Sequence, residues 1–169
     1  MNSSNWKLDT SNANKNGAGT LTFTNVDGKE DLLYAATSVT TGADLKNMPE
    51  SVKLQFGHLL SKVKFTFTNG FVNENNTLKI TGITMEVPGQ GTIDLATDNW
   101  WKDETQATWN LKGNKSTTLS FGDIKEGLKL AAGEGAECQF ERFTIPAAAT
   151  EKYIVTFHVE LFNGEQTAY

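Results

Sequence analysis

Apolar residues recur at every second position along much of this chain, and that spacing constrains the fold more than any other feature. In the stretch TLTFTNV, Leu21 and Phe23 alternate with threonines. Successive side chains of a β-strand point to opposite faces, so a period of two indicates strands that bury one face. The stretch KYIVTFHVELF places His158 on its polar side, opposite an apolar stripe made of Tyr153, Val155, Phe157, Val159 and Leu161.

Helical patterns are correspondingly weak. No segment keeps a helical apolar period for three turns, and residues 42–51 could hold one short turn at most. Thr, Asn and Gly are abundant, which favours half-exposed strands joined by turns. About nine or ten short strands separated by turn signals predict an all-β fold, an antiparallel β-sandwich with bulged strands and little or no helix.

Glycine-containing turns and breaks divide the strands. Asp27 with Gly28 predicts a hairpin-type turn, and Asn163 with Gly164 predicts another. Gly82 interrupts the alternation of LKITGITMEV, so we expect a β-bulge there. The residues PGQG at 88–91 predict a hairpin that joins this strand to TIDLAT.

The length of 169 residues suits one domain with a substantial core. Residues 1–19 are rich in Asn, Ser and Gly and predict a flexible lead-in. Residues 20–169 then form a single β-sandwich domain. Because strand signals stop soon after a turn signal, we expect this domain to be a fragment of a longer chain.

The stretch SVKLQFGHLLSKVKFTF, residues 51–67, changes register in its middle. Its apolar face begins with Val52 and changes side near Ser61, where a bulge or break is predicted. His58 shares a face with apolar residues, which indicates a structural histidine rather than a catalytic one. The residues expected in the core are Leu54, Phe56, His58, Leu60, Val63 and Phe65.

Composition argues against several classes of function. The net charge of −5, with Arg142 as the only arginine, disfavours a nucleic-acid surface. Cys138 is the single cysteine, which excludes an intramolecular disulfide and predicts a buried structural thiol. No apolar run is long enough for a transmembrane helix, and the first residues lack the apolar core of a signal peptide.

Motifs for catalysis or for cofactor binding are absent from the sequence. HExxH, the phosphate-binding GxxxxGK[ST] and GxGxxG are missing, and nothing pairs a histidine with a nucleophile. We therefore expect no enzymatic activity, no cofactor and no metal. The oxygens of NVDGKED, at Asn25, Asp27 and Asp31, could suggest a calcium loop, but the spacing favours a plain turn.

The stretch DNWWKDETQATW supports an alternative function. Trp100, Trp101 and Trp109 lie close together in the sequence, and exposed indole rings on a sandwich could stack on sugars. Alternation would turn one residue of the adjacent pair inward. The alternative is thus a carbohydrate-binding β-sandwich module that uses exposed tryptophans.

Several motifs occur together and in one order: DLLYA at residues 31–35, VKLQFGHLLSKVKFTF at 52–67, LKITGITM before GTIDL, and FTIPA before the last long strand. In this combination the chain resembles the fimbrillin family, the type V pilins and related surface lipoproteins of gut and oral anaerobic bacteria. The resemblance covers about residues 30–165 and includes the pattern around His58.

The resemblance implies a transthyretin-like β-sandwich that is exported through the periplasm and displayed at the outer membrane or in a fimbria. Its expected partners are other pilin subunits, joined by β-strand exchange after removal of an N-terminal strand, and surface glycans or proteins of host or bacterial cells. The function implied is that of a structural or accessory fimbrial subunit in adhesion. A lipobox cysteine, an arginine ahead of the domain and the family's last strands are missing from this chain, which supports the fragment interpretation.

Overall fold

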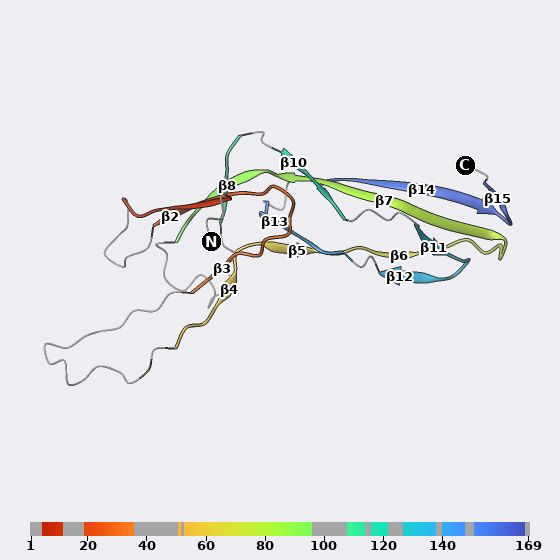
Figure 1. Cartoon of the computed structure of the whole chain (residues 1–169), viewed down its shortest axis with the longest axis horizontal. Coiled ribbons are helices and arrows are strands. Elements are labelled where there is room, and N and C mark those ends of the chain that lie inside the picture. The colour runs from red at the N-terminus through yellow and green to blue at the C-terminus, as the bar shows by residue number, and fades with distance from the viewer. Residues whose placement is uncertain are drawn as a thin grey trace, which may run out of the picture.

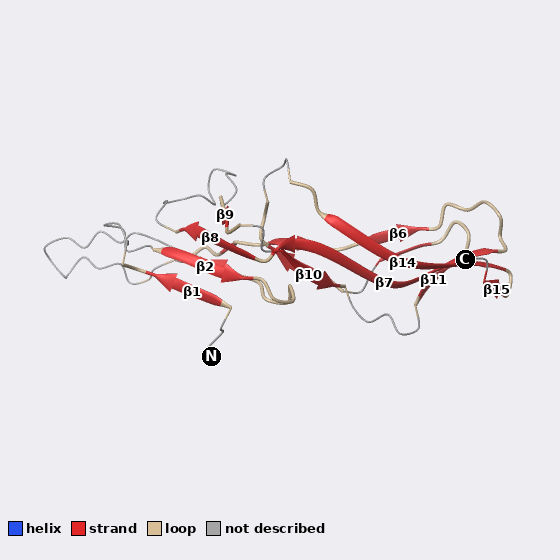
Figure 2. Ribbon diagram, turned by 90° about the horizontal axis from the view of Figure 1, so that it is seen from above, coloured by secondary structure: helices blue, strands red, loops and turns tan. Residues whose placement is uncertain are grey.

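The structure is a computed structural model, and it describes residues 5–11, 19–35, 51, 53–95, 108–113, 116–121, 127–137, 140–147 and 151–167. Within these ranges the regular structure is β-strand, with no helix (Figure 2). The strands are β1 Trp6–Asp9, β2 Thr20–Thr24, β3 Leu33–Tyr34, β4 Gly57–His58, β5 Ser61–Val63, β6 Thr66–Thr68, β7 Asn76–Pro88, β8 Gln90–Asp94, β9 Asn110–Leu111, β10 Ser116–Ser120, β11 Leu128–Leu130, β12 Gly135–Glu137, β13 Arg142–Thr144, β14 Ile154–Asn163 and β15 Gln166–Thr167.

The strands form two larger sheets and three short ribbons. One sheet has the order β1-β2-β8-β9, and the other has the order β10-β7-β14-β15 with β11 also paired to β7. The ribbons are β12-β6, β13-β5 and β3-β4. Figure 1 shows β5, β6 and β12 as a layer that faces β7 and β14 along the long axis of the molecule. All described pairings are antiparallel, which confirms the predicted all-β, sandwich-like class.

The central strand is β7, which is 13 residues long and pairs with three other strands. β14 lies along one edge, while β10 and β11 share the other edge. The pairing with β14 shifts register where Gly82 faces His158 and Ile80 faces Val159. Thr81 is therefore the extra residue of a bulge, and its hydroxyl donates to the carbonyl of His158 at 3.3 Å. The bulge expected at Gly82 is confirmed.

Residues 88–91 do not form the predicted hairpin. β7 and β8 belong to different sheets, and the chain passes from one to the other through Gly89 (Figure 1). The carbonyl of Gly89 accepts a hydrogen bond from the amide of Asn25, and Gln90 then pairs with Thr24. PGQG thus keeps the backbone extended through the sheet change, because β8 finds its partner in β2 rather than in β7.

Each sheet covers its own apolar cluster. Beneath the first sheet lie Leu21, Phe23, Leu59, Leu60, Ile93, Leu95, Trp109 and Ile145. The second sheet covers Ile80, Ile83, Met85, Val87, Leu119, Phe121 and Leu130. Val63, Phe65 and Phe67 are partly buried against this second cluster. Within β7 the buried positions are in phase before the bulge and again after it, as the alternation predicted.

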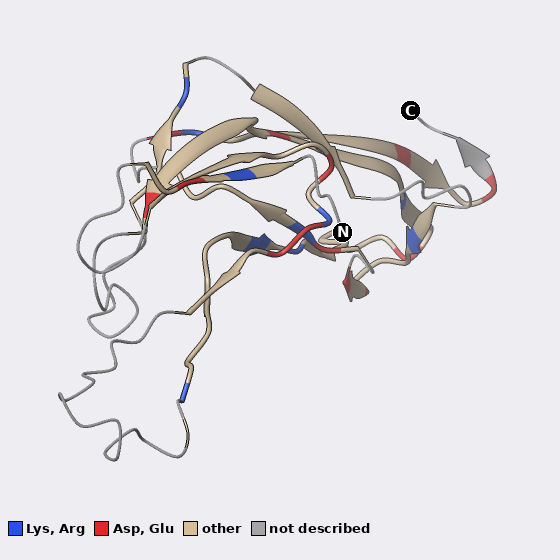
Figure 3. Cartoon of the chain, turned by 60° about the vertical axis from the view of Figure 1, so that its left-hand side comes forward, with Lys and Arg blue, Asp and Glu red and all other residues tan. Residues whose placement is uncertain are grey.

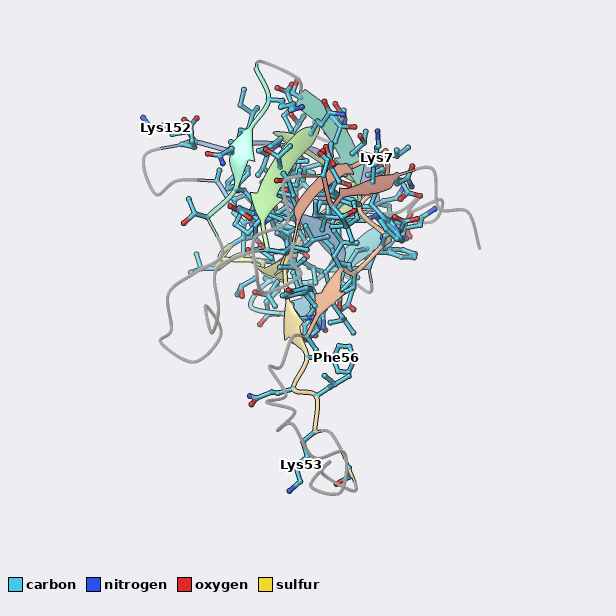
Figure 4. The ribbon with its side chains drawn as sticks, turned by 90° about the vertical axis from the view of Figure 1, so that its left-hand side faces the viewer. Lys7, Lys53, Phe56 and Lys152 are labelled. Atoms are coloured by element: carbon cyan, nitrogen blue, oxygen red, sulfur yellow. The ribbon has the colours of Figure 1, made fainter. Side chains whose placement is uncertain are left out.

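The expectation that Leu54, Phe56 and His58 lie in the core is wrong. The exposed fractions of Leu54 and Phe56 are 53% and 60%, and the His58 side chain is 67% exposed. β4 pairs only with β3 among the described strands, and Figure 4 shows Phe56 on a part of the chain that extends away from the sheets. None of the described strands covers either face there, so alternation does not translate into burial. The adjacent Leu59 and Leu60 enter the core instead, at 2% and 6% exposure.

The structure also bears on the predicted flexible lead-in and on the predicted exposure of His158. Residues 6–9, inside the expected flexible lead-in, form β1, whose Trp6 and Leu8 alternate with Lys7 and Asp9. His158 is exposed, as its polar face predicted. The possible helical turn at 42–51 lies almost entirely outside the described residues, as does Cys138. No helix long and apolar enough to cross a membrane occurs in the described part of the chain.

A fully buried asparagine ties the far end of β7 to the connections around it. Asn69 donates from Nδ2 to the carbonyls of Asn76 and Leu130, at 3.1 and 2.9 Å. Its Oδ1 accepts from the amide of Phe71 at 3.0 Å. The amide of Asn69 also donates to the carbonyl of Glu134, and its carbonyl accepts from the amide of Gly133, so this residue joins the β6-β7 connection to the β11-β12 connection.

We predict that Asn69→Ala lowers the free energy of unfolding by about 2 to 3 kcal/mol, because buried backbone groups lose their partners. Urea denaturation followed by circular dichroism measures the change. The control is Asn75→Ala at an exposed position of the same turn, with an expected change below about 0.5 kcal/mol. Equal effects of the two substitutions would contradict the role given to Asn69.

Candidate strand-docking groove

β14 and β6, which belong to different layers, each have an edge that is not fully paired among the described strands. β14 pairs with β7 along its whole length, but on its other side only Phe162 and Asn163 pair, with β15. β6 pairs with β12 on one side. No described strand pairs with the second edge of β6 or with residues 154–161 of β14 on their outer side. These edges expose backbone donors and acceptors that an added strand can use.

An apolar groove lies between β6 and β14. Its volume is about 360 Å³. The floor contains Ile80 and Leu130, which are 3% and 2% exposed, whereas Phe157 and Val159 on β14 are 44% and 47% exposed. Phe65, Thr66, Phe67, Thr68 and Leu78 complete its lining. The groove therefore has a closed apolar floor and an apolar wall that water reaches.

Aromatic rings join the two walls of this groove. Phe157 of β14 meets Phe65 and Phe67 edge to face, with ring centroids 5.6 Å apart in both pairs. Phe65 also contacts the buried ring of Phe121, at 4.8 Å between centroids. Edge-to-face pairs fix ring orientation and add to the stabilisation from burial. The aromatic rings of the groove are therefore fixed in orientation by their contacts with one another and with the buried ring of Phe121.

Charged side chains lie near the groove but do not line it. Lys79 and Glu160 form an ion pair at 3.0 Å between neighbouring strands, and Lys64, which lies just before β6, pairs with Glu137 of β12. Both pairs are partly exposed and contribute little to stability. None of the residues that line the groove is titratable. The groove thus offers apolar burial and backbone hydrogen bonding, and it has no group for acid–base chemistry.

Only part of the expected set of core residues reaches this groove. Phe65 lines it, Val63 packs against the adjacent cluster, and Leu60 is buried in the other cluster. Sequence analysis missed Phe157 and Val159 as surface residues, because their alternation on the last long strand predicts a covered stripe. These two residues are exposed because no described strand pairs with the outer side of β14 beside them. Which strands pair is decided by distant parts of the chain, so the local sequence does not indicate this exposure.

His58 occupies a structural setting outside the groove. Its Nδ1 lies 2.8 Å from Oδ2 of Asp31, and Leu33 is its partner across β3 and β4. This contact ties the base of the β3-β4 ribbon to the segment that enters it. The exposed position agrees with a role in pairing, although the burial expected for His58 is wrong.

The segment NVDGKED forms a turn that uses its own oxygens. Asn25 accepts from the amide of Gly28 and donates from Nδ2 to the carbonyl of Phe143, at 3.0 and 3.1 Å. The amide of Lys29 donates to Oδ1 of Asp27, and this hydrogen bond lowers the pKa of the Asp27 carboxyl. Gly28 adopts a φ of 69°, which favours glycine. The turn connects β2 to β3, which do not pair, so it is not a hairpin turn.

Trp109 does not offer a surface for sugars. It is 8% exposed, and its Nε1 donates to the carbonyl of Leu59 at 2.9 Å. Its ring also lies 6.5 Å from Phe23, centroid to centroid. The indole thus anchors the break after β4 to the first sheet. Trp100 and Trp101, the other residues of the expected glycan platform, lie outside the described residues.

Comparison with known proteins adds one finding. A family model described as fimbrillin-like matches residues 8–165, which is most of the chain. Neither a curated protein nor a solved structure matches this chain. The matched range includes every strand that lines the groove.

We predict that a charged residue can replace Val159 without unfolding the protein. In Val159→Lys the aliphatic stem can lie along the groove while the ammonium group stays in water. The free energy of unfolding should change by less than about 1 kcal/mol, as should that of Thr156→Lys on the opposite, exposed face of β14. Urea denaturation measures both. A loss above about 2 kcal/mol for Val159→Lys alone would show that the groove is closed in solution.

Proposed function

Because the chain belongs to the fimbrillin-like family, we propose that it is a fimbrial subunit that accepts a β-strand from a neighbouring subunit in the groove between β6 and β14. The family is one of structural pilus proteins, which implies a location at the cell surface and association with other pilus subunits. The finer assignment, docking by strand exchange and a role in adhesion, rests on the groove and its open edges.

The observation that carries the proposal is the outer edge of β14 along residues 154–161, which no described strand pairs and which lies beside an apolar groove. An extended segment beside residues 154–161 would hydrogen-bond to backbone groups that no other described strand uses. Alternate side chains of that segment would point into the groove, since successive residues of a strand face opposite sides. This is recognition by β-augmentation, in which backbone bonds supply affinity and side-chain pockets supply specificity.

Burial in the groove would supply much of the binding free energy. Phe157 and Val159 each retain nearly half of their exposed surface in the isolated chain. Covering apolar surface contributes about 25 cal/mol for each Å² removed from water. The inserted side chains would add a similar contribution, and each new backbone hydrogen bond about 1 kcal/mol. A strand that fits several positions can therefore hold two subunits together without covalent bonds.

The same groove argues for a noncatalytic role. It combines phenylalanine, aliphatic and threonine side chains with open backbone edges. We further propose that the protein reaches the surface by export through the periplasm and is held at the outer membrane as a lipoprotein or within a fimbria. Family membership supports this part of the proposal.

The test compares fimbria formation by cells that carry the full-length protein or its variants. Val159→Lys should reduce detergent-resistant multimers by about tenfold or more, because a lysine in the groove obstructs the inserted strand. Unboiled denaturing gels and negative-stain microscopy measure the multimers and the filaments.

The matched control is Thr156→Lys, which adds the same charge to the outward face of the same strand. It should assemble like the parent protein. Wild-type levels of multimers from a folded Val159→Lys variant would contradict strand docking in this groove. Equal losses from both variants would indicate a general effect of charge on β14.

A further inference from the structure

A second pocket lies where the two sheets join, and we call it the junction pocket. It is formed by the end of β7, by β9, by the start of β10 and by the segment that leads into β14. Its volume is about 290 Å³, and it shares no lining residue with the β6-β14 groove. Leu111 and Ile154, which are 36% and 59% exposed, give it apolar surface that a ligand can reach.

Tyr153 gives the junction pocket an aromatic wall. The side chain lines the pocket and is 37% exposed, so it is open to a ligand. Its Oη accepts a hydrogen bond from the amide of Ala147 at 3.2 Å. This bond ties the hydroxyl end of the side chain to the backbone and limits the orientations of the ring. A tyrosine ring held in this way offers apolar surface to a flat ligand.

Two carboxylates line the same pocket, and water reaches both. Glu86 belongs to β7 and shares a face of the sheet with Ile154, its partner on β14. Glu151 belongs to the segment before β14. Neither carboxylate forms a hydrogen bond or an ion pair with another described residue. Lys152 lies beside them, but its side chain extends outward, away from the sheets (Figure 4).

From this geometry we propose that the junction pocket binds one hexopyranose unit of a glycan. One apolar face of the sugar ring packs against Tyr153, and Leu111 and Ile154 add apolar surface beside it. Hydroxyls of the sugar donate to Glu86 and Glu151, and hydrogen bonds to an ionised acceptor are stronger than those between neutral groups. Ligand sites in proteins commonly combine aromatic walls with a few polar groups that fix the orientation of the ligand.

The arrangement favours a neutral sugar over a cation. Glu86 and Glu151 are exposed and come from different segments, so water and salt screen their attraction for a single ammonium group. A sugar carries several hydroxyls, which can donate to both carboxylates while a face of the ring covers Tyr153. Ser116 adds a hydroxyl that can donate or accept. A linear polyol has the hydroxyls but lacks the ring face.

The test is a titration of the intact protein, followed by two-dimensional amide NMR, with four compounds: methyl β-galactoside, methyl β-glucoside, sorbitol and cadaverine. At least one glycoside should shift the signals of Gly113, Ser116 and Ala147, which line the pocket, and should bind about tenfold tighter than sorbitol. Added salt should leave its affinity unchanged, because the sugar is neutral.

Tyr153→Leu should weaken binding of that glycoside about tenfold, because it removes the aromatic wall. The matched control is Phe140→Leu, which changes an aromatic residue of similar exposure outside the pocket and should bind like the parent protein. Glu86→Gln, at an exposed position, should weaken binding about threefold even if Tyr153→Leu fails to fold. Its control is Glu74→Gln, which lies outside the pocket and should have no effect.

Failure of both glycosides to bind more tightly than sorbitol would overturn the proposal. Equal affinities of folded Tyr153→Leu and Phe140→Leu, or of Glu86→Gln and Glu74→Gln, would also overturn it. Cadaverine binding more tightly than either glycoside, with an affinity that falls as salt is added, would indicate a cation site instead. The proposal does not rest on strand docking, so Val159→Lys should leave glycoside binding unchanged.

Discussion

The arrangement of the two sheets depends on one long strand, β7, whose backbone continues from one sheet into the other. β7 pairs with β14 on one edge and with β10 and β11 on the other, then continues through Gly89 into β8. The amide of Asn25 bonds to the carbonyl of Gly89, so the crossing is fixed from the first sheet. Because the same run of backbone belongs to both sheets, the two apolar clusters are joined end to end.

This continuity determines where strand edges remain open. With both edges of β7 paired, residues 154–161 of β14 form the outer edge of the described sheet beyond the short pairing with β15, and β6 faces β14 from the other layer. Figure 3 shows the long strands as a curved layer and the β3-β4 ribbon as an extension away from it. The apolar side chains of β14 point inward but are not fully covered, since the opposite layer is narrow. An acceptor groove of this kind is a consequence of strand order, and it needs no special residues beyond the alternation itself.

The local sequence pattern correctly predicted those features that neighbouring residues alone determine. The bulge at Gly82 followed from a change of phase within β7, and the inward set of Ile80, Ile83 and Met85 followed from the same pattern. By contrast, Leu54 and Phe56 alternate just as regularly but lie just before β4, where no described strand covers them. Likewise PGQG has turn chemistry, yet the pairing of β8 with β2 keeps it extended. Burial and strand order depend on distant partners, so the groove could not be predicted from spacing alone.

The central claim is that a strand from a neighbouring subunit pairs with the open edge of β14. Hydrogen–deuterium exchange, measured on the isolated protein and on assembled fimbriae, tests it most directly. Amides of residues 155–161 that are not bonded to β7 should exchange rapidly in the isolated protein and become protected in the fimbria. Those of the opposite, paired edge should be protected in both states. Unchanged, rapid exchange along β14 in assembled fimbriae would contradict the account.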